Sequence, residues 1–443
     1  MAHIHSIKKL LNIKDPNIIL NENSVKIEKK DGVECAFIDG KLTYQPIGCT
    51  VCGVKNESYQ DIIKNGTKQS TIKLTHVNFQ PIILRLKKQR FLCKHCHSTF
   101  SAETSLVNRH CFISNEIKST IAMELRETQS MTLIAKHLFV SPSTVLRVLR
   151  DVAETIRIDP LSLPEHLSID EFKSVKNVSG AMSFLFIDAS SHQLGDIVEN
   201  RQLTYLLDYF SRYPIESREN VKTVTMDMYS PYIQMVKNCF PNAKIIIDRF
   251  HIVQHMNRAL NSIRIKVMNE LRYISPTDYS KLKKLWKLVL KNESDLNYTN
   301  YSSHRLFEGL MTEKMIVDYM IQLDPRLERV YSLFNQLKWA LERRDFDHFS
   351  KYLEESKKYT LPRKARTVIQ TFESFKDSIE NAFIYTLSNG PIEGINNKIK
   401  NIKRSGYGYR NFYNLRARLL ITYRLTKNTF KPRPLYFKDE KVA

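Results

Sequence analysis

The chain has 443 residues, of which 42% are hydrophobic, and this is enough apolar surface for real cores and excludes a chain that is disordered throughout. No apolar run approaches the roughly 18 residues that cross a membrane, and the N-terminus lacks a signal-peptide pattern, so we expect a cytoplasmic protein with no membrane partner. The formal net charge of +22 indicates a polyanionic partner, most often nucleic acid. A generic basic protein is the alternative on composition alone.

The positive charge is concentrated toward the two ends of the chain. Residues 396–443 carry 13 Lys or Arg against two Asp or Glu, and residues 41–110 carry 11 against three. Residues 160–250, by contrast, carry nine basic and 11 acidic side chains. A mildly acidic middle between basic flanks fits a metal-holding core served by DNA-binding modules.

Four of the seven cysteines form two C-x2-C pairs, Cys49 with Cys52 and Cys93 with Cys96. Each pair places two thiolates on one tight turn, and two such turns can complete a tetrahedral zinc site. An odd number of cysteines without a secretion signal argues against disulfides. We therefore predict a structural Zn²⁺ site, since four thiolates leave no open position for chemistry. Reduced thiols without a metal are the alternative.

The 40 residues between the two pairs are expected to be folded, because the usual gap between such pairs is roughly 15–20 residues. Segments 70–76 and 81–86 have the composition of β-strands. We predict that they form a ribbon that brings the cysteine pairs together, within a zinc-binding domain over residues 41–108. Residues 1–40 have no assignment.

A group of short helices is predicted after the zinc-binding domain. Residues 114–126 have an amphipathic pattern that begins with a polar cap, and residues 130–138 form a short helical segment. Ser141 and Pro142 are typical of the cap and the first position of a further helix. We therefore expect helices joined by short turns over residues 110–158.

A short helix, a turn and a capped second helix within about 20 residues is the layout of a helix-turn-helix domain. In that geometry Ser143, Thr144 and Arg147 would point toward the major groove of DNA. The alternative is an ordinary helical hairpin, but the neighbouring cysteine pairs and the basic charge favour DNA binding.

The acidic middle alternates between strand and helix patterns. Strands are predicted at 166–172, 182–188, 193–201, 221–227 and 244–248. Helices are predicted at 203–210, at 230–240 and from residue 249 onward. The order β-β-β-α-β-α-β-α predicts an α/β layer with a mixed sheet, which is the ribonuclease-H-like plan.

Two aspartates are predicted at strand ends in this layer. Asp170 ends the first strand and Asp227 ends the fourth, and these strands are neighbours in the ribonuclease-H-like plan. Adjacent carboxylates of this kind are what a two-Mg²⁺ phosphoryl-transfer site requires. Turn or cap roles for the two aspartates are the alternative.

A third carboxylate lies far downstream, on a helix that Pro391 opens. Glu393 is near its first turn, where a capping role is the alternative. The polar and basic side chains that we expect on the same helical face are Asn396, Asn397, Lys400 and Arg404. Such a face could bind a metal ion and track DNA phosphates.

Several of these features together resemble the ISL-three family of bacterial insertion-sequence transposases. The motifs that carry the resemblance, besides the cysteine pairs and the helix-turn-helix pattern, are Ser168-Ile-Asp170-Glu, Val224-Thr-Met-Asp227-Met, Asp248-Arg-Phe-His251 and Asn389-Gly-Pro-Ile-Glu393-Gly-Ile-Asn-Asn-Lys-Ile-Lys. They cover nearly the whole chain in the family's order, and the block from Asn389 is the most specific.

The resemblance implies a DDE transposase with a ribonuclease-H-like catalytic core. Its catalytic carboxylates would be Asp170, Asp227 and Glu393, and these would hold Mg²⁺ or Mn²⁺. Asp248 and His251 resemble an accessory element of related enzymes. Asp248 also ends a strand, but the family's second aspartate lies on the fourth strand, which favours Asp227.

The resemblance also implies how the catalytic core is divided. It would consist of residues 160–256 and 386–430, with an all-helical insertion over residues 257–385 between them and a basic tail at 431–443. Two tryptophans, Trp286 and Trp339, lie in the insertion. We expect both to pack in its core rather than to stack on a DNA base.

Such an enzyme would bind the terminal inverted repeats of its element, cut the DNA and join the ends to target DNA. Its partners would be double-stranded DNA and a second copy of the chain, since two ends must be cut together. The predicted phosphate-binding residues are Asn397, Lys400, Lys403, Arg404, Arg410, Arg416 and Arg418. The alternatives are a DNA-binding regulator with an inactive core and a nuclease that cuts without joining.

Overall fold

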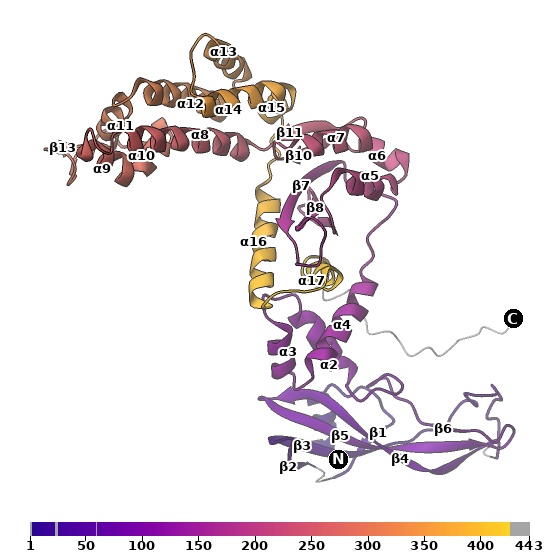
Figure 1. Cartoon of the computed structure of the whole chain (residues 1–443). Helices are drawn as coiled ribbons and strands as arrows, with labels where there is room; N and C mark the ends of the chain where they lie inside the picture. Colours follow the sequence, from indigo (N-terminus) through magenta and orange to yellow (C-terminus); the bar gives the residue numbers. More distant parts are fainter. Residues whose placement is uncertain (1, 23–24, 59, 426–443) are drawn as a thin grey trace. The chain divides into compact units, whose positions relative to one another are not determined.

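The computed structural model describes residues 2–22, 25–58 and 60–425. They form two compact units, of which one contains the described residues up to Arg157 and those from Lys398 onward, and the other contains Ile158–Asn397 (Figure 1). Among the described residues, no helix combines the length and the apolar character that crossing a bilayer requires. The expected basic tail at 431–443 lies outside the described residues.

The first unit begins with a six-stranded mixed sheet in the order β1-β3-β5-β4, with β2 beside β3 and β6 beside β5. Its elements are α1 (Ala2–Leu10), β1 (Ile18–Leu20), β2 (Lys26–Lys30), β3 (Val33–Leu42), β4 (Ile62–Val77), β5 (Gln80–Cys93) and β6 (Thr99–Ser101). The long antiparallel pair β4–β5 confirms the predicted ribbon. The segment left without an assignment supplies α1, β1, β2 and most of β3, and β3 pairs in parallel with β5.

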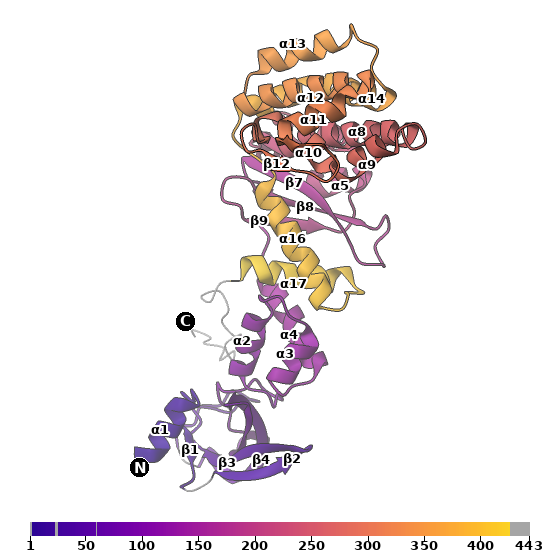
Figure 2. The same ribbon diagram turned by 90° about the vertical axis from the view of Figure 1, so that its left-hand side faces the viewer.

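The first unit also contains the helices α2 (Asn115–Glu124), α3 (Met131–His137), α4 (Pro142–Thr155) and α17 (Phe412–Arg424), together with the part of α16 (Gly390–Ser405) from Lys398 onward. The side chains of Ser114, Ser130 and Ser141 each accept a hydrogen bond from a backbone N–H three residues later, so these serines cap α2, α3 and α4. Although α17 is remote in sequence, its Ala417 and Ile421 share a buried core with α2–α4. The four helices lie together in Figure 2.

The second unit contains a five-stranded mixed sheet in the order β11-β10-β7-β8-β9. Its elements are β7 (His166–Lys173), β8 (Met182–Asp188), β9 (Leu194–Val198), α5 (Leu203–Ser211), α6 (Ile215–Glu219), β10 (Thr223–Met226), α7 (Ser230–Cys239) and β11 (Lys244–Ile247). The strands β7, β10 and β11 are parallel, while β8 is antiparallel to both of its neighbours. The sheet is therefore mixed, as predicted, and β7 and β10 are neighbours.

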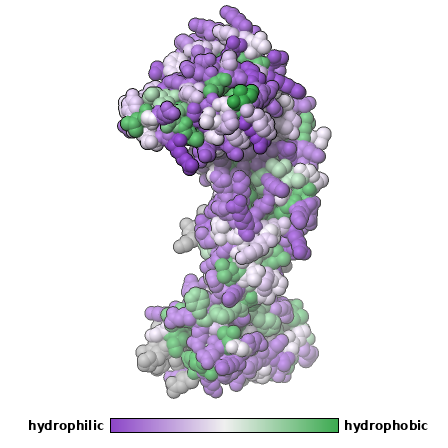
Figure 3. Space-filling view, turned by 60° about the vertical axis from the view of Figure 1, so that its left-hand side comes forward, coloured by the Kyte–Doolittle hydropathy of each residue, from purple (hydrophilic) through white to green (hydrophobic). Residues whose placement is uncertain are grey.

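A helical insertion follows β11 (Figure 1). Its elements are α8 (Arg249–Glu270), α9 (Pro276–Lys284), α10 (Trp286–Leu290), the 3-10 turn η1 (Glu293–Asp295), β12 (Ser302–Ser303), β13 (Leu310–Met311), α11 (Glu313–Gln322), α12 (Pro325–Arg343), α13 (Phe346–Ser356), α14 (Arg363–Ser374) and α15 (Lys376–Ile384). The insertion is thus helical apart from the two-residue strands β12 and β13. Its apolar side chains form one continuous core with those of the sheet, and hydrophilic side chains cover most of its face in Figure 3.

Two details of the insertion differ from simple core packing. Trp286 and Trp339 are 37% and 39% exposed, so the expectation that both are core residues is wrong. The guanidinium of Arg343 lies 4.8 Å from the ring centroid of Trp339 and covers one face of this partly exposed ring. On the buried side of α12, Lys338 is 2% exposed and its Nζ has no hydrogen-bond partner among the described atoms.

Candidate active site and zinc centre

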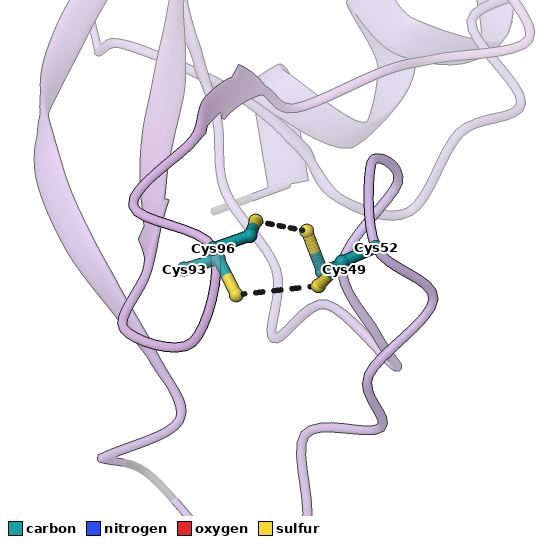
Figure 4. A group of neighbouring side chains, drawn as sticks. All are labelled: Cys49, Cys52, Cys93 and Cys96. Atoms are coloured by element: carbon teal, nitrogen blue, oxygen red, sulfur yellow. Dashed lines mark hydrogen bonds between the residues drawn. The ribbon is translucent and has the colours of Figure 1, made fainter.

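The four predicted cysteines lie together in the first unit (Figure 4). The Sγ atoms of Cys49 and Cys96 are 3.6 Å apart, those of Cys52 and Cys93 are 3.8 Å apart, and all four lie within 4.8 Å of one another. A tetrahedral Zn²⁺ with bonds of about 2.3 Å requires sulfur atoms about 3.8 Å apart. The donor set and its spacing therefore fit a structural zinc ion in a zinc ribbon.

Tight backbone turns set this geometry. The N–H of Gly53 donates to the carbonyl of Cys49, and Gly53 has a φ of +74°, which a residue with a side chain rarely adopts. On the opposite turn, the N–H of Cys93 donates to the carbonyl of Ser98. Hydrogen bonds from Ser98 also lower the pKa of Cys96 to about 6, which favours its thiolate form. Despite a hydrogen bond from the N–H of Val54, burial and the neighbouring thiols raise the pKa of Cys52, so a bound cation is needed to stabilise further thiolates.

Strand register places three aspartates side by side in the second unit. Ser168 pairs with Thr225, so Asp170 and Asp227, each two residues later, lie on adjacent strands. Met226 pairs with Ile247, and Asp227 and Asp248 follow them directly. Asp170 is an interior residue of β7 rather than its last residue, because β7 continues to pair with β8 beyond it. This corrects the prediction that Asp170 ends the strand.

His251 lies in the first turn of α8, between two of these carboxylates. Its Nδ1 is 2.9 Å from Asp227 Oδ1 and 3.3 Å from Asp248 Oδ2. Burial alone would lower the pKa of His251, but the hydrogen bonds to both carboxylates and their charges raise it to about 10. Burial alone would raise the pKa of Asp248. Hydrogen bonds from His251 and from the N–H of Asn389 lower it by more than burial raises it, so the net shift is downward. The imidazolium and the two carboxylates thus stabilise one another's charged forms.

Asp170 is in a different electrostatic setting. Burial raises its pKa to about 7, and the neighbouring charge of Asp227 adds to this effect, against a hydrogen bond from the N–H of Glu171. Asn396 Nδ2 donates to Asp170 Oδ2 at 2.6 Å and so orients the carboxylate. A buried carboxylate beside a second one is stabilised in its charged form by a cation, and oxygen ligands suit Mg²⁺ or Mn²⁺. The residues present therefore fit a divalent metal site.

Helix α16 (Gly390–Ser405) brings Glu393 to the same place. Ligand atoms of Asp248, His251 and Glu393 lie within 4.8 Å of one another. In the part of the chain that the structure describes, Asp170, Asp227 and Glu393 do not share that spacing as a set of three. Glu393 is therefore brought beside the predicted accessory pair, and His251 connects it to Asp227.

Asn389 is a residue of this site for which the sequence patterns predicted no role. It is fully buried, and its Oδ1 accepts a hydrogen bond from Ser168 Oγ at 2.5 Å. Its Nδ2 lies 3.5 Å from both the carbonyl oxygen of Ile169 and Asp227 Oδ1, while its backbone N–H donates to Asp248 Oδ1 at 3.0 Å. Asn389 therefore connects three strands to the start of α16. The sequence feature that could have indicated this role is the position of Asn389 immediately before the helix, within the most specific motif.

Glu171, next to Asp170, is neutralised by other partners. Arg201 Nη1 contacts it at 2.5 Å and the hydroxyl of Tyr232 donates to it at 2.6 Å. The paired acidic residues of the Ser168-Ile-Asp170-Glu motif thus differ in function: Asp170 faces the carboxylate cluster and Glu171 forms an ion pair.

The predicted DNA-contacting side chains on the helices of the first unit differ in exposure. Ser143 and Arg147 are exposed on α4. Thr144 is 7% exposed and its hydroxyl lies 3.0 Å from Ser141 Oγ, so its prediction as a base reader is wrong. Arg418 is fully buried in α17, where its Nη2 donates to the carbonyls of Glu127 and Gln129 at 2.6 and 2.9 Å. Its guanidinium therefore stabilises the packing of α17 and is not placed to bind a phosphate.

The other predicted phosphate contacts, all on or after α16, differ in exposure. The exposed residues are Asn397, Lys400, Arg404 and Arg410, and the half-buried ones are Lys403 and Arg416. Asn396, which was expected on the same face as Asn397, is instead buried against Asp170.

Comparisons with known proteins identify a family and relatives for the chain. A family model described as a transposase matches residues 167–419, which is more than half of the chain. The transposase for insertion sequence element IS1001 of Bordetella parapertussis is 24% identical over 331 residues, which are 74% of this chain and 78% of that protein. An ATP-dependent protease of Lactococcus lactis subsp. lactis is 34% identical over 140 residues, or 28% of this chain.

The chain spans only 44% of the length of the Lactococcus relative, so the activity in that relative's name is not carried over. The matched region of the family model, in contrast, contains the three adjacent aspartates, His251, Asn389 and Glu393. The residues that the fold gathers into one site are thus those that the family model spans, and the chain belongs to the ISL3 family of DDE transposases of insertion sequences.

Proposed function

We propose that the chain is a metal-dependent transposase that cuts DNA at the ends of its element and joins those ends to target DNA. The observation that carries this proposal is that three neighbouring strands bring Asp170, Asp227 and Asp248 side by side. Glu393, from a helix more than 140 residues after Asp248 in sequence, lies beside Asp248 and His251. The strand order 3-2-1-4-5, counted from β7 to β11, supports a ribonuclease-H-like core.

Asp170, Asp227 and Glu393 would hold two Mg²⁺ or Mn²⁺ ions, which supply an activated water or 3′-hydroxyl and stabilise the leaving 3′ oxygen. The protein's own side chains fix the carboxylates. Asn396 orients Asp170, and His251 holds a proton at Nδ1 against Asp227 and Asp248. Asp248, being nearly buried and paired with the Asn389 N–H, serves as a support for His251 and the start of α16.

The first unit would recognise the terminal inverted repeats. Its zinc ribbon and the capped helices α3 and α4, which we assign to a helix-turn-helix domain, are typical of DNA-binding modules. Ser143 and Arg147 would face the major groove, and the exposed cations Lys400, Arg404 and Arg410 would neutralise phosphates. Since two ends must be cut together, we propose that the active complex contains two copies of the chain.

The test is cleavage and strand transfer on DNA that carries the element's ends, with wild type, Asp227→Asn and Glu393→Gln. Both variants keep the shape of the side chain but lose a charged ligand, so we expect activity to fall by at least about 10³-fold while DNA binding is unchanged. Asp188→Asn is the matched control. Asp188 also ends a strand, but its carboxylate binds the N–H of Ser190 and the hydroxyl of Ser191 in a turn.

Each alternative gives a different result in this assay. A regulator with an inactive core would bind the ends but leave the DNA uncut with Mg²⁺ or Mn²⁺. A nuclease would cut the ends without producing joined products. Loss of activity in the Asp188→Asn control as well would point to a general effect of charge rather than to the proposed site.

A further inference from the structure

The helical insertion contains a cavity that is separate from the carboxylate site. It has a volume of about 680 Å³ and lies between the end of α13 and α14, two helices that are labelled in Figure 1. The residues that line it and matter here are Lys357, Tyr359, Leu361, Arg366, Gln370 and Glu373. Ligand pockets in proteins are typically about 300–1,000 Å³, so the cavity is large enough for one nucleotide.

The segment that forms the cavity has an excess of basic residues. Residues 354–374 carry five Lys or Arg and three Glu, and Lys357 Nζ lies 2.7 Å from Glu354 Oε1. Two of the cations, Lys357 and Arg366, line the cavity. Arg366 Nη2 donates to the carbonyl of Leu361 at 3.2 Å, which fixes the guanidinium at the wall. Such a concentration of positive charge favours a phosphate-bearing ligand.

An aromatic ring is presented at the same place. Tyr359 is 54% exposed. The guanidinium of Arg329, on α12, lies 5.7 Å from the ring centroid of Tyr359 and donates from Nη1 to the carbonyl of Thr360. Arg329 therefore holds the loop that carries the ring. An exposed ring beside cations is the combination that binds unpaired bases in nucleic acid.

A buried acceptor completes the cavity. Glu373 Oε1 is buried and has no hydrogen-bond partner among the described atoms, while its other oxygen, Oε2, is 3.6 Å from Lys357 Nζ. Leaving a carboxylate oxygen unpartnered in a buried position is costly. The exocyclic amine of a base is a donor that would satisfy it.

We propose that this cavity binds one unpaired nucleotide of a DNA strand, with the base against Tyr359 and Glu373 and the phosphate at Lys357 and Arg366. The inference rests on the proposed function, because cutting at an element's end exposes strands that can lose their pairing. Flanking phosphates would contact the exposed Lys358, Arg363 and Lys364, so a strand should bind more tightly than a free mononucleotide.

The test uses full-length protein without divalent ions, so that catalysis plays no part. The probe is a DNA duplex with a three-nucleotide single-stranded overhang that contains 2-aminopurine, whose fluorescence is quenched by stacking, and a blunt duplex serves as the reference. We expect wild type to prefer the overhang and to quench the probe. Tyr359→Ala should weaken overhang binding about 5- to 150-fold, while Tyr359→Phe should keep it. Deoxyadenosine monophosphate should compete poorly.

Tyr273→Ala is the matched control, because Tyr273 is 86% exposed in the insertion and also has an arginine, Arg272, 5.5 Å from its ring. It should leave overhang binding unchanged. Quenching that survives Tyr359→Ala, equal loss in Tyr273→Ala, or equal affinity for blunt DNA overturns the cavity's role while leaving the proposed function intact. Failure of wild type to bind either DNA overturns both.

Discussion

Asn389 gives the sharpest test of how the candidate site is held together. In Asn389→Ala, Ser168 Oγ loses its buried acceptor, and the contacts of Nδ2 with the carbonyl of Ile169 and with Asp227 are lost. Asn389 and Ser168 are both fully buried, so water cannot replace these partners without rearrangement. A buried polar group left without a partner costs about 1–3 kcal/mol, and the vacated volume adds to this.

We therefore expect Asn389→Ala to lower the free energy of unfolding of the second unit by about 2–4 kcal/mol. For a unit of this size, each kcal/mol lowers Tm by roughly 2–4 °C, so its transition should move down by roughly 4–16 °C. Differential scanning calorimetry can follow this transition separately from that of the first unit. Asn397→Ala, an exposed neighbour on the same helix, should shift it by less than about 2 °C.

A double-mutant cycle isolates the buried hydrogen bond itself. Ser168→Ala leaves Asn389 Oδ1 without its donor, and the double variant removes both partners together. Because the two side chains are in contact, their effects should be non-additive by about 0.5–3 kcal/mol. A Tm unchanged in Asn389→Ala, or strictly additive effects in the cycle, would refute the reasoning that Asn389 connects the strands to α16.

Three further predictions concern other parts of the chain. Elemental analysis should find about one zinc per chain in wild type and none in Cys49→Ser, and calorimetry should show a less stable first unit in that variant. A zinc-free wild type would contradict this prediction. Arg418→Ala should destabilise that unit by about 2–4 kcal/mol. Arg147→Ala should leave stability within about 0.5 kcal/mol, weaken binding to the element's ends by about 1–3 kcal/mol and relax the sequence specificity there. The reverse pattern would exchange the roles of the two arginines. Burial lowers the pKa of Lys338 to about 8, so between pH 8 and 10.5 the unfolded chain binds a proton that the folded chain has lost. In denaturant unfolding, the stability of wild type should therefore rise with pH by up to about 3 kcal/mol relative to Lys338→Met. Parallel pH profiles of the two proteins would contradict this prediction.

Local sequence patterns were sufficient for the cysteine pairs, the serine caps and the strands of the second unit. Each depends on residues within a few positions of one another, such as Ser141 and the N–H of Thr144 or the turn from Cys49 to Gly53. The adjacency of Asp170 and Asp227 could also be predicted, because the strand order follows from the plan of the sheet.

What the sequence did not show depends on contacts between remote segments. The interior position of Asp170 is set by the pairing of β7 with β8. Arg418 is buried because α17 packs on helices almost 300 residues earlier, and a basic residue in a basic segment gives no local sign of this. The strands β1 and β2 are short, and β3 is stabilised by parallel pairing with β5.

The neighbours of the predicted triad could not be identified from local sequence for the same reason. The proximity of Glu393 to Asp248 and His251 joins segments about 140 residues apart. Asn396 was expected on the helical face that carries Glu393, and Asn389 had no predicted role, yet both bind aspartates of the site. Their roles follow only from the packing of α16 against the sheet.

The measurement that tests the central claim most directly is ion-dependent cleavage of an element end whose scissile 3′ oxygen is replaced by sulfur. Mn²⁺ accepts a sulfur ligand more readily than Mg²⁺ does. We predict that wild type cuts the oxygen substrate with either ion and the sulfur substrate only with Mn²⁺, and that Asp227→Asn cuts neither. An equal effect of sulfur with both ions, or cleavage that persists in Asp227→Asn, would contradict a metal ion held by these carboxylates at the leaving oxygen.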